Sequence, residues 1–209
     1  MVERNIDKVS IELANACDLS AWISSRLNET SFNTSVRKRV VAPCFAVTLD
    51  HFDAVLVLLG RNPKIYSSSF ALMRLVFESY IRGLWLLYCA TDEEVESFSS
   101  GTFELPRKIE VMINSIENVC DFDGKQLSIT RSKYWKQLCD YTHTGILQVQ
   151  RWNKYDSIEP SYSDDEVIEV IRFTKSYALL AAISFAEAVL NNSELANEFL
   201  TKASEMVTQ

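Results

Sequence analysis

Apolar residues recur every three or four positions along most of this chain, which is the spacing of one face of an α-helix. No segment of four or more residues alternates cleanly between polar and apolar positions, as a half-buried strand would. The four prolines fall at or near the breaks in the helical pattern. The pattern predicts helices over 7–27, 36–59, 67–90, 92–98, 107–119, 132–142, 163–190 and 194–206.

These elements predict an all-α fold. With 209 residues, 47% of them hydrophobic, the chain is long enough to bury a substantial core. We expect a single domain over residues 1–209, built as a bundle of about seven or eight helices with long antiparallel central helices. Two boundaries carry specific signals. Ser163 with Glu166 three residues later has the spacing of a capping box, and Gly145 either ends the helix over 132–142 or lies inside a longer one that reaches residue 152.

The predicted central helix over 67–88 is apolar on nearly every side, yet it contains Arg74, Glu78 and Arg82. Residues four apart lie on one strip of a helix, so these three side chains share a strip. One interpretation is a polar slot in which Glu78 holds one arginine while the other faces an anionic ligand such as a phosphate. The alternatives are a charged strip exposed along a groove, or an internal ion network that fixes the packing of the helices.

Composition and charge narrow the class of protein. The formal net charge of −7 argues against a protein that coats nucleic acid, although a local basic site stays open. The N-terminus is charged and lacks a secretory core, and no uninterrupted apolar run reaches the ~18 residues of a membrane span. The five cysteines show no CxxC or Cys/His ligand spacing. We therefore expect a cytoplasmic protein with free thiols, no membrane, no metal and no cofactor.

The chain has two histidines, and we examine both as site residues. His51 lies on an apolar stripe, where it is either a hydrogen-bonded core residue or a ligand-binding group in a groove. His143 follows Tyr141 at a predicted helix end, where an imidazole can act as a general acid or base or can cap the helix. Arg151 would share the face of His143 if the helix continued through Gly145. Tyr141 and Arg151 are therefore added to the candidate ligand-binding residues.

Several segments together resemble a family of uncharacterised bacterial helical proteins. They are DHFDAVLVLLGRNPKIYSSSFALMRLVFESYIRGLWLL, CATDEEVESF, and YTHTG with Gln148 and Arg151 after it. More distantly, the Arg-x-x-x-Glu helix and the late histidine resemble the HEPN-like superfamily and its abortive-infection relatives. This resemblance implies a helical bundle, a homodimer and, in active members, a metal-independent ribonuclease. The nuclease signature places an arginine four to six residues before a histidine, a spacing absent at His51 and His143.

Two functions follow as expectations. The first is a HEPN-like protein of bacterial stress or phage defence, which binds RNA, another phosphate-containing ligand or a partner through a polar Arg/Glu/His groove. The second is a metal-independent ribonuclease with a rearranged site. In it His143 would be the general acid or base, Arg74, Arg82 or Arg151 would stabilise the developing charge, and Glu78 would orient an arginine. Whether the protein is an enzyme stays open at this point.

Overall fold

The computed structural model describes residues 7–28, 35–120 and 124–207 of the chain. Within these ranges it contains nine α-helices and one π-helical segment, with an isolated bridge between Asn153 and Ile158 and no strand, which confirms the predicted all-α fold class. The elements are α1 Lys8–Asn28, α2 Val36–Gly60, α3 Tyr66–Tyr88, α4 Asp92–Ser99, α5 Ile109–Val119, α6 Gln126–Thr142, α7 Ile146–Gln150, α8 Asp164–Ser184, η1 Phe185–Val189 and α9 Ser193–Val207.

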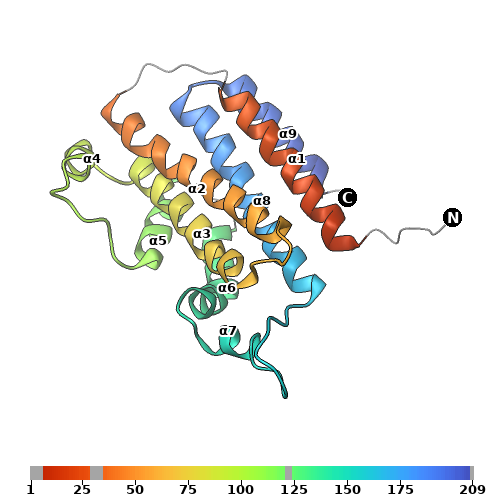
Figure 1. The fold of residues 1–209 in the computed structure, drawn as a ribbon. Helices are drawn as coiled ribbons and strands as arrows, with labels where there is room; N and C mark the ends of the chain where they lie inside the picture. The colour runs from red at the N-terminus through yellow and green to blue at the C-terminus, as the bar shows by residue number, and fades with distance from the viewer. Residues whose placement is uncertain (1–6, 29–34, 121–123, 208–209) are drawn as a thin grey trace.

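Helices α2 and α3 form an antiparallel hairpin at the centre of the bundle, with α8 beside it and α1 and α9 along one flank (Figure 1). The two central helices approach closely because Gly83 of α3 has no side chain. A Cβ at this position would lie 2.6 Å from the Phe45 ring of α2. A hydrogen bond of 2.8 Å joins Thr48 and Ser79 across the same interface. The hairpin therefore holds α3 in a fixed position for the residues that it presents on its other side.

Local capping explains where the observed helices differ from the expected ones. The capping box of Ser163 and Glu166 is present at the start of α8. Helix α6 begins six residues earlier than its pattern suggests, because the buried carboxylate of Glu117 in α5 accepts the Ser128 backbone N–H at 2.8 Å. The helix ends at Thr142, and Gly145 precedes the separate short helix α7. This separation gives more helices than the seven or eight expected.

By length and composition alone, α2 could cross a membrane. The core helices of soluble proteins pass the same test, so this property is weak support for a span. Helix α2 packs against α3 and α8, and it buries Phe45, Phe52 and Leu59. Its place in the bundle is thus compatible with a soluble protein, and the cytoplasmic location stays a prediction.

Glu12 of α1 lies between Lys175 and Arg172 of α8, and its carboxylate accepts from the Arg172 Nη2 at 3.1 Å. Burial raises the pKa of Glu12, but the hydrogen bonds and charges of Lys175 and Arg172 outweigh it and leave the pKa below its ordinary value. A depressed pKa stabilises the fold above the unfolded-state pKa, and this stabilisation is lost as the pH falls through the folded-state pKa. The ion pairs of Glu12 with Lys175 and Arg172 therefore stabilise the fold at neutral pH, and this stabilisation is lost in acid.

We expect Glu12→Gln to lower the free energy of unfolding by about 1 kcal/mol at pH 7, and by less at pH 3, which lies below the unfolded-state pKa, so that part of the stabilisation is already lost. Urea denaturation at the two pH values measures both differences. Glu104→Gln is the matched control, because that side chain is 83% exposed and its pair with Arg107 is 3.4 Å long. An equal loss of stability at both pH values would contradict an electrostatic role for Glu12.

Candidate functional site

The three charged residues of α3 form one linked unit. Glu78 accepts from the Arg74 Nε through its Oε1 at 2.6 Å, and from the Arg82 Nη2 through its Oε2 at 3.1 Å. The side chains of Arg74 and Glu78 are 19% and 14% exposed, whereas that of Arg82 is 50% exposed. Glu78 therefore holds both arginines and not only one, and Arg82 has the greater access to solvent.

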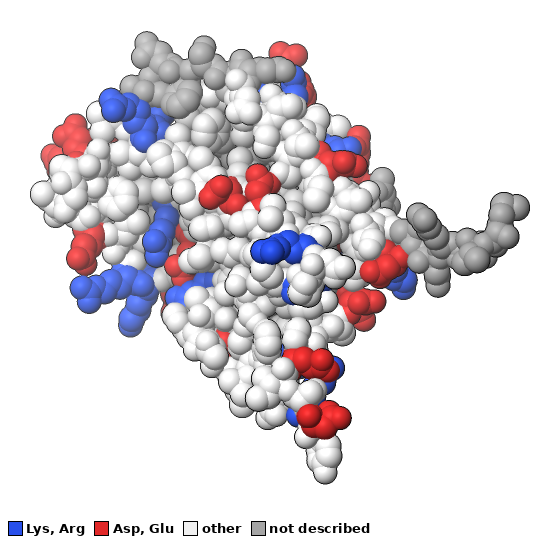
Figure 2. Space-filling model, in the orientation of Figure 1, with Lys and Arg blue, Asp and Glu red and all other residues white. Residues whose placement is uncertain are grey.

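This unit forms one wall of a groove with a volume of about 410 Å³. We call it the cationic groove, because five basic and two acidic side chains line it. The other walls come from the segment before α5, from α5 and from α6. Figure 2 shows Lys and Arg side chains gathering at one edge of the molecule, beside the connection between α4 and α5. The lining residues are Arg74, Glu78, Arg82, Pro106, Arg107, Lys108, Ile109, Glu110, Met112, Arg131 and Trp135.

Trp135 of α6 lies between two arginines in this groove. The Arg74 guanidinium lies over its ring at 4.9 Å from the centroid, and that of Arg131 at 6.0 Å. Arg131 also donates to Glu110 of α5 at 2.9 Å, while its buried Nε has no partner in the described part of the chain. The indole thus packs against the Arg74 guanidinium while Glu78 accepts from its Nε, and cation–π contacts of this kind stabilise a guanidinium without neutralising its charge.

Sequence reasoning found only the α3 strip and missed the other basic members of the groove, Arg107, Lys108 and Arg131, together with Trp135 and Glu110. Arg131 and Trp135 are four residues apart and share a face of α6, but the helix was expected to begin only at residue 132. Arg107 and Lys108 stand directly before the first residue of α5, where basic side chains oppose the helix dipole. This unfavourable placement was a signal in the sequence that these cations serve something other than the helix.

His143 contacts Arg74 of the α3 unit, but it is not among the residues that line the cationic groove. It is the C-terminal capping residue of α6, its side chain is exposed, and its Nε2 is in hydrogen-bond contact with the Arg74 Nη1. Arginine can only donate, so a hydrogen bond between these two atoms requires the Nε2 to accept, as it does in the tautomer that is protonated on Nδ1. Thr142 donates to the Ala71 carbonyl of α3 at 3.3 Å, which fixes this end of α6 beside α3.

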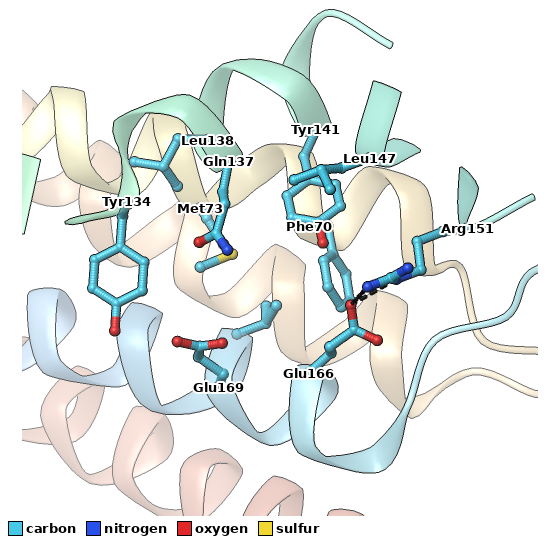
Figure 3. A pocket seen from close by; sticks show the side chains of 11 residues that line it. Phe70, Met73, Tyr134, Gln137, Leu138, Tyr141, Leu147, Arg151, Glu166 and Glu169 are labelled. Carbon is cyan, nitrogen blue, oxygen red and sulfur yellow. Dashed lines mark hydrogen bonds and ion pairs between the residues drawn. The ribbon is translucent and has the colours of Figure 1, made fainter. Parts of the chain in front are cut away.

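The remaining candidates lie elsewhere. Tyr141 and Arg151 line a second, smaller hollow, which Figure 3 shows from close by. The break between α6 and α7 separates Arg151 from the face of His143, and Arg151 instead donates to Glu166 at 2.6 Å. His51 is half-buried on α2, which contributes no lining residue to either space. Burial lowers the pKa of His51, with the Asp50 charge acting in the opposite direction.

Metal ligation finds no support in the geometry of the described residues. Nowhere in 7–28, 35–120 or 124–207 do three His, Cys, Asp or Glu side chains form a group that could hold a metal ion. The five cysteines are free, and Cys17 is exposed on α1. The chemistry available in the cationic groove is therefore that of guanidinium, ammonium, imidazole, carboxylate and indole groups.

The fold and the groove define an all-α protein with a cationic site between α3, α5 and α6. The chain belongs to the family of unknown function DUF6988, which matches residues 45–207. The match includes the groove residues, His143, and the residues of the smaller hollow. No curated protein and no solved structure matches the chain significantly.

Proposed function

We propose that the protein binds a phosphate-bearing ligand in the cationic groove. The observation that carries this proposal is the charge of the groove: three positive charges are in excess in a hollow of about 410 Å³, on a chain whose net charge is −7. Such a local excess attracts anions against the overall field of the protein. The resemblance of the sequence to HEPN-like proteins favours RNA as the source of the phosphate.

The geometry of the arginines suits phosphate better than a simple anion. Glu78 and Trp135 hold the Arg74 guanidinium in one orientation, so little side-chain entropy is lost when it binds a phosphate through two donors. Arg82 and Arg107 are half or more exposed and can reach a second phosphate. An aromatic ring among cations is also the combination that single-stranded RNA sites use, where bases stack and phosphates pair with arginine or lysine.

We expect Arg107→Ala combined with Lys108→Ala to weaken binding of a labelled single-stranded RNA about tenfold at low salt. Fluorescence anisotropy measures the affinity, and the slope of log affinity against log salt should fall by about 1.4 for two lost phosphate contacts. The control variant combines Arg61→Ala with Lys64→Ala, which removes two cations outside the groove. Equal weakening in both variants would show that only the overall charge matters.

A metal-independent ribonuclease is the second candidate, and the contact between Arg74 and His143 favours it. A phosphodiester that entered between these side chains would have a proton acceptor and a guanidinium on the same phosphate. His143 would move the proton of the attacking 2′-hydroxyl or of the leaving oxygen, and Arg74 would stabilise the charge that develops on the phosphorane. Glu78 would act as a positioning residue for both arginines.

A role in bacterial stress or phage defence, cytoplasmic location and a homodimeric state are further parts of the proposal. They rest on the resemblance to HEPN-like proteins, and the groove does not bear on them. Sedimentation equilibrium of the full chain tests the homodimer, and a purely monomeric distribution at micromolar concentration would remove it. Efficiency of plating on cells that express the wild-type chain or Arg74→Ala tests the role in defence, and equal plating would count against it.

A further inference from the structure

The smaller hollow lies between α3, α6, α7 and α8, and it is separate from the cationic groove. Its volume is about 80 Å³, roughly half that of an engineered cavity of about 150 Å³ that holds benzene. A group of roughly three or four heavy atoms therefore fits inside. Phe70, Met73 and Val170 contribute apolar surface, and Gln137, Glu166 and Glu169 contribute polar groups. We call this space the α6–α8 hollow (Figure 3).

Tyr141 presents an unused polar group to the α6–α8 hollow. Its side chain is nine-tenths buried, with 9% exposed, and its ring packs edge-on against Phe70 at 5.0 Å between centroids. Figure 3 shows the hydroxyl turned toward the space beside Phe70 and Arg151. No hydrogen bond to this hydroxyl is formed by the described residues. Burial raises the pKa of Tyr141 to about 12, so the hydroxyl stays protonated. The hydroxyl itself is not one of the fully buried unpaired atoms, so it is accessible from the hollow and free to bind a group that enters there.

The charges around the hollow are unbalanced. Arg151 is neutralised by Glu166, which accepts from its Nε at 2.6 Å and also from its Nη2. Glu169, one helical turn further along α8, has no ion pair or hydrogen bond with the described residues, and Figure 3 shows its carboxylate facing the hollow opposite Gln137. Lys133 stacks over the Tyr134 ring at 4.7 Å from the centroid and does not line the hollow. The lining itself therefore carries one net negative charge, on the exposed Glu169, and Lys133 interacts with that charge from outside the hollow.

We propose that the α6–α8 hollow binds the cationic head group of a small amine or guanidine. The Glu169 carboxylate and the Gln137 carbonyl accept from its N–H groups, and the Tyr141 oxygen accepts a further one. Its apolar part contacts Met73 and the face of Phe70, which also attracts a cation. The head group is either that of a free small molecule or that of an arginine or lysine side chain of a peptide.

Methylguanidinium is the probe for the free ligand, and its neutral isostere N-methylurea is the control. We expect methylguanidinium to shift the backbone amide signals of α6 and α8 saturably in two-dimensional NMR, with an affinity in the roughly millimolar range. N-methylurea should give no saturable shift at the same concentration and ionic strength. In the peptide arm, acetyl-Gly-Arg-Gly-amide is compared with the same peptide containing citrulline. Tighter binding of the arginine peptide than of methylguanidinium would assign the site to a protein partner, and weaker binding would assign it to a free molecule.

Substitutions test which residues of the α6–α8 hollow bind the cationic head group. Glu169→Gln should weaken binding of methylguanidinium about tenfold, because it removes the one carboxylate of the lining that does not pair with Arg151. Tyr141→Phe should weaken it less and keep the ring contact with Phe70. Asp165→Asn is the matched control, since it removes an exposed carboxylate from the same helix outside the hollow and should leave the affinity unchanged. The proposal is overturned if N-methylurea binds equally well, if Glu169→Gln binds as the wild type does, or if methylguanidinium gives no saturable shift.

Discussion

Replacing Glu78 with alanine is expected to lower the free energy of unfolding by about 3 kcal/mol. The substitution leaves the guanidinium groups of Arg74 and Arg82 on one strip of α3 with no counter-charge between them. Arg74 is the more costly of the two, because its side chain is only 19% exposed and Trp135 covers it. Removing one partner of such a largely buried pair costs more than the pair contributes, since the remaining charge stays partly desolvated. Urea denaturation followed by circular dichroism measures the difference.

Glu110→Ala is the matched control for this substitution. Glu110 also lines the cationic groove and pairs with an arginine, but its side chain is 53% exposed, so we expect a loss below about 1 kcal/mol. The effect of inorganic phosphate on the free energy of unfolding is a second test. It should stabilise Glu78→Ala more than the wild type, because it replaces the missing negative charge in the folded state. A variant as stable as the wild type would contradict the bracing role of Glu78. Equal stabilisation by phosphate would contradict an anion site at Arg74 and Arg82.

The sequence predicted the parts of the fold and site that depend on neighbouring residues. The helical periodicity gave the all-α class, the Ser163–Glu166 spacing gave the start of α8, and the four-residue spacing gave the strip of Arg74, Glu78 and Arg82. Each of these features is local, so the geometry of one helix determines it. The contact of His143 with this strip was also expected, because the chain offers only two histidines and no competing motif.

The features that the sequence did not predict depend on contacts between distant segments. Glu117 caps α6 from α5, and no pattern within α6 shows this. Arg107 and Arg131 reach the groove from two different elements, and only the packed bundle brings them to Arg74. Arg151 was expected beside His143, but a helix break places it with Glu166. Tertiary packing thus added three basic side chains to the two arginines of the strip, and it placed Tyr141 and Arg151 at a separate hollow.

A groove that only binds phosphate and one that cleaves RNA share Arg74, Arg82 and Arg107, so loss of affinity cannot separate the two functions. The distinction lies in His143. Its Nε2 contacts Arg74, yet its side chain is exposed, so a substrate phosphate can reach it without displacing a buried group. A binding site needs only the donors, whereas cleavage without a metal also needs a group that accepts and returns a proton.

If the protein is a ribonuclease, His143→Ala is expected to slow RNA cleavage by roughly 10²–10⁴-fold, the usual contribution of a general acid or base. The wild-type chain should cleave single-stranded RNA in the presence of EDTA and leave 2′,3′-cyclic phosphate ends, because the attacking group is the neighbouring 2′-hydroxyl. Gel analysis of a labelled RNA measures the rate, and RNA binding by His143→Ala should stay within a few-fold of the wild type. Arg74→Ala should slow cleavage as well and also weaken binding.

His51→Ala is the control, because it removes the other histidine of the chain from a helix that contributes nothing to the groove. It should cleave RNA at the wild-type rate. Cleavage that persists in His143→Ala at the wild-type rate would exclude His143 from the chemistry and point to a contaminating nuclease. A wild-type chain that binds RNA tightly without cleaving it would exclude the ribonuclease and leave the phosphate-binding function in place, since binding depends on the arginines and not on the imidazole.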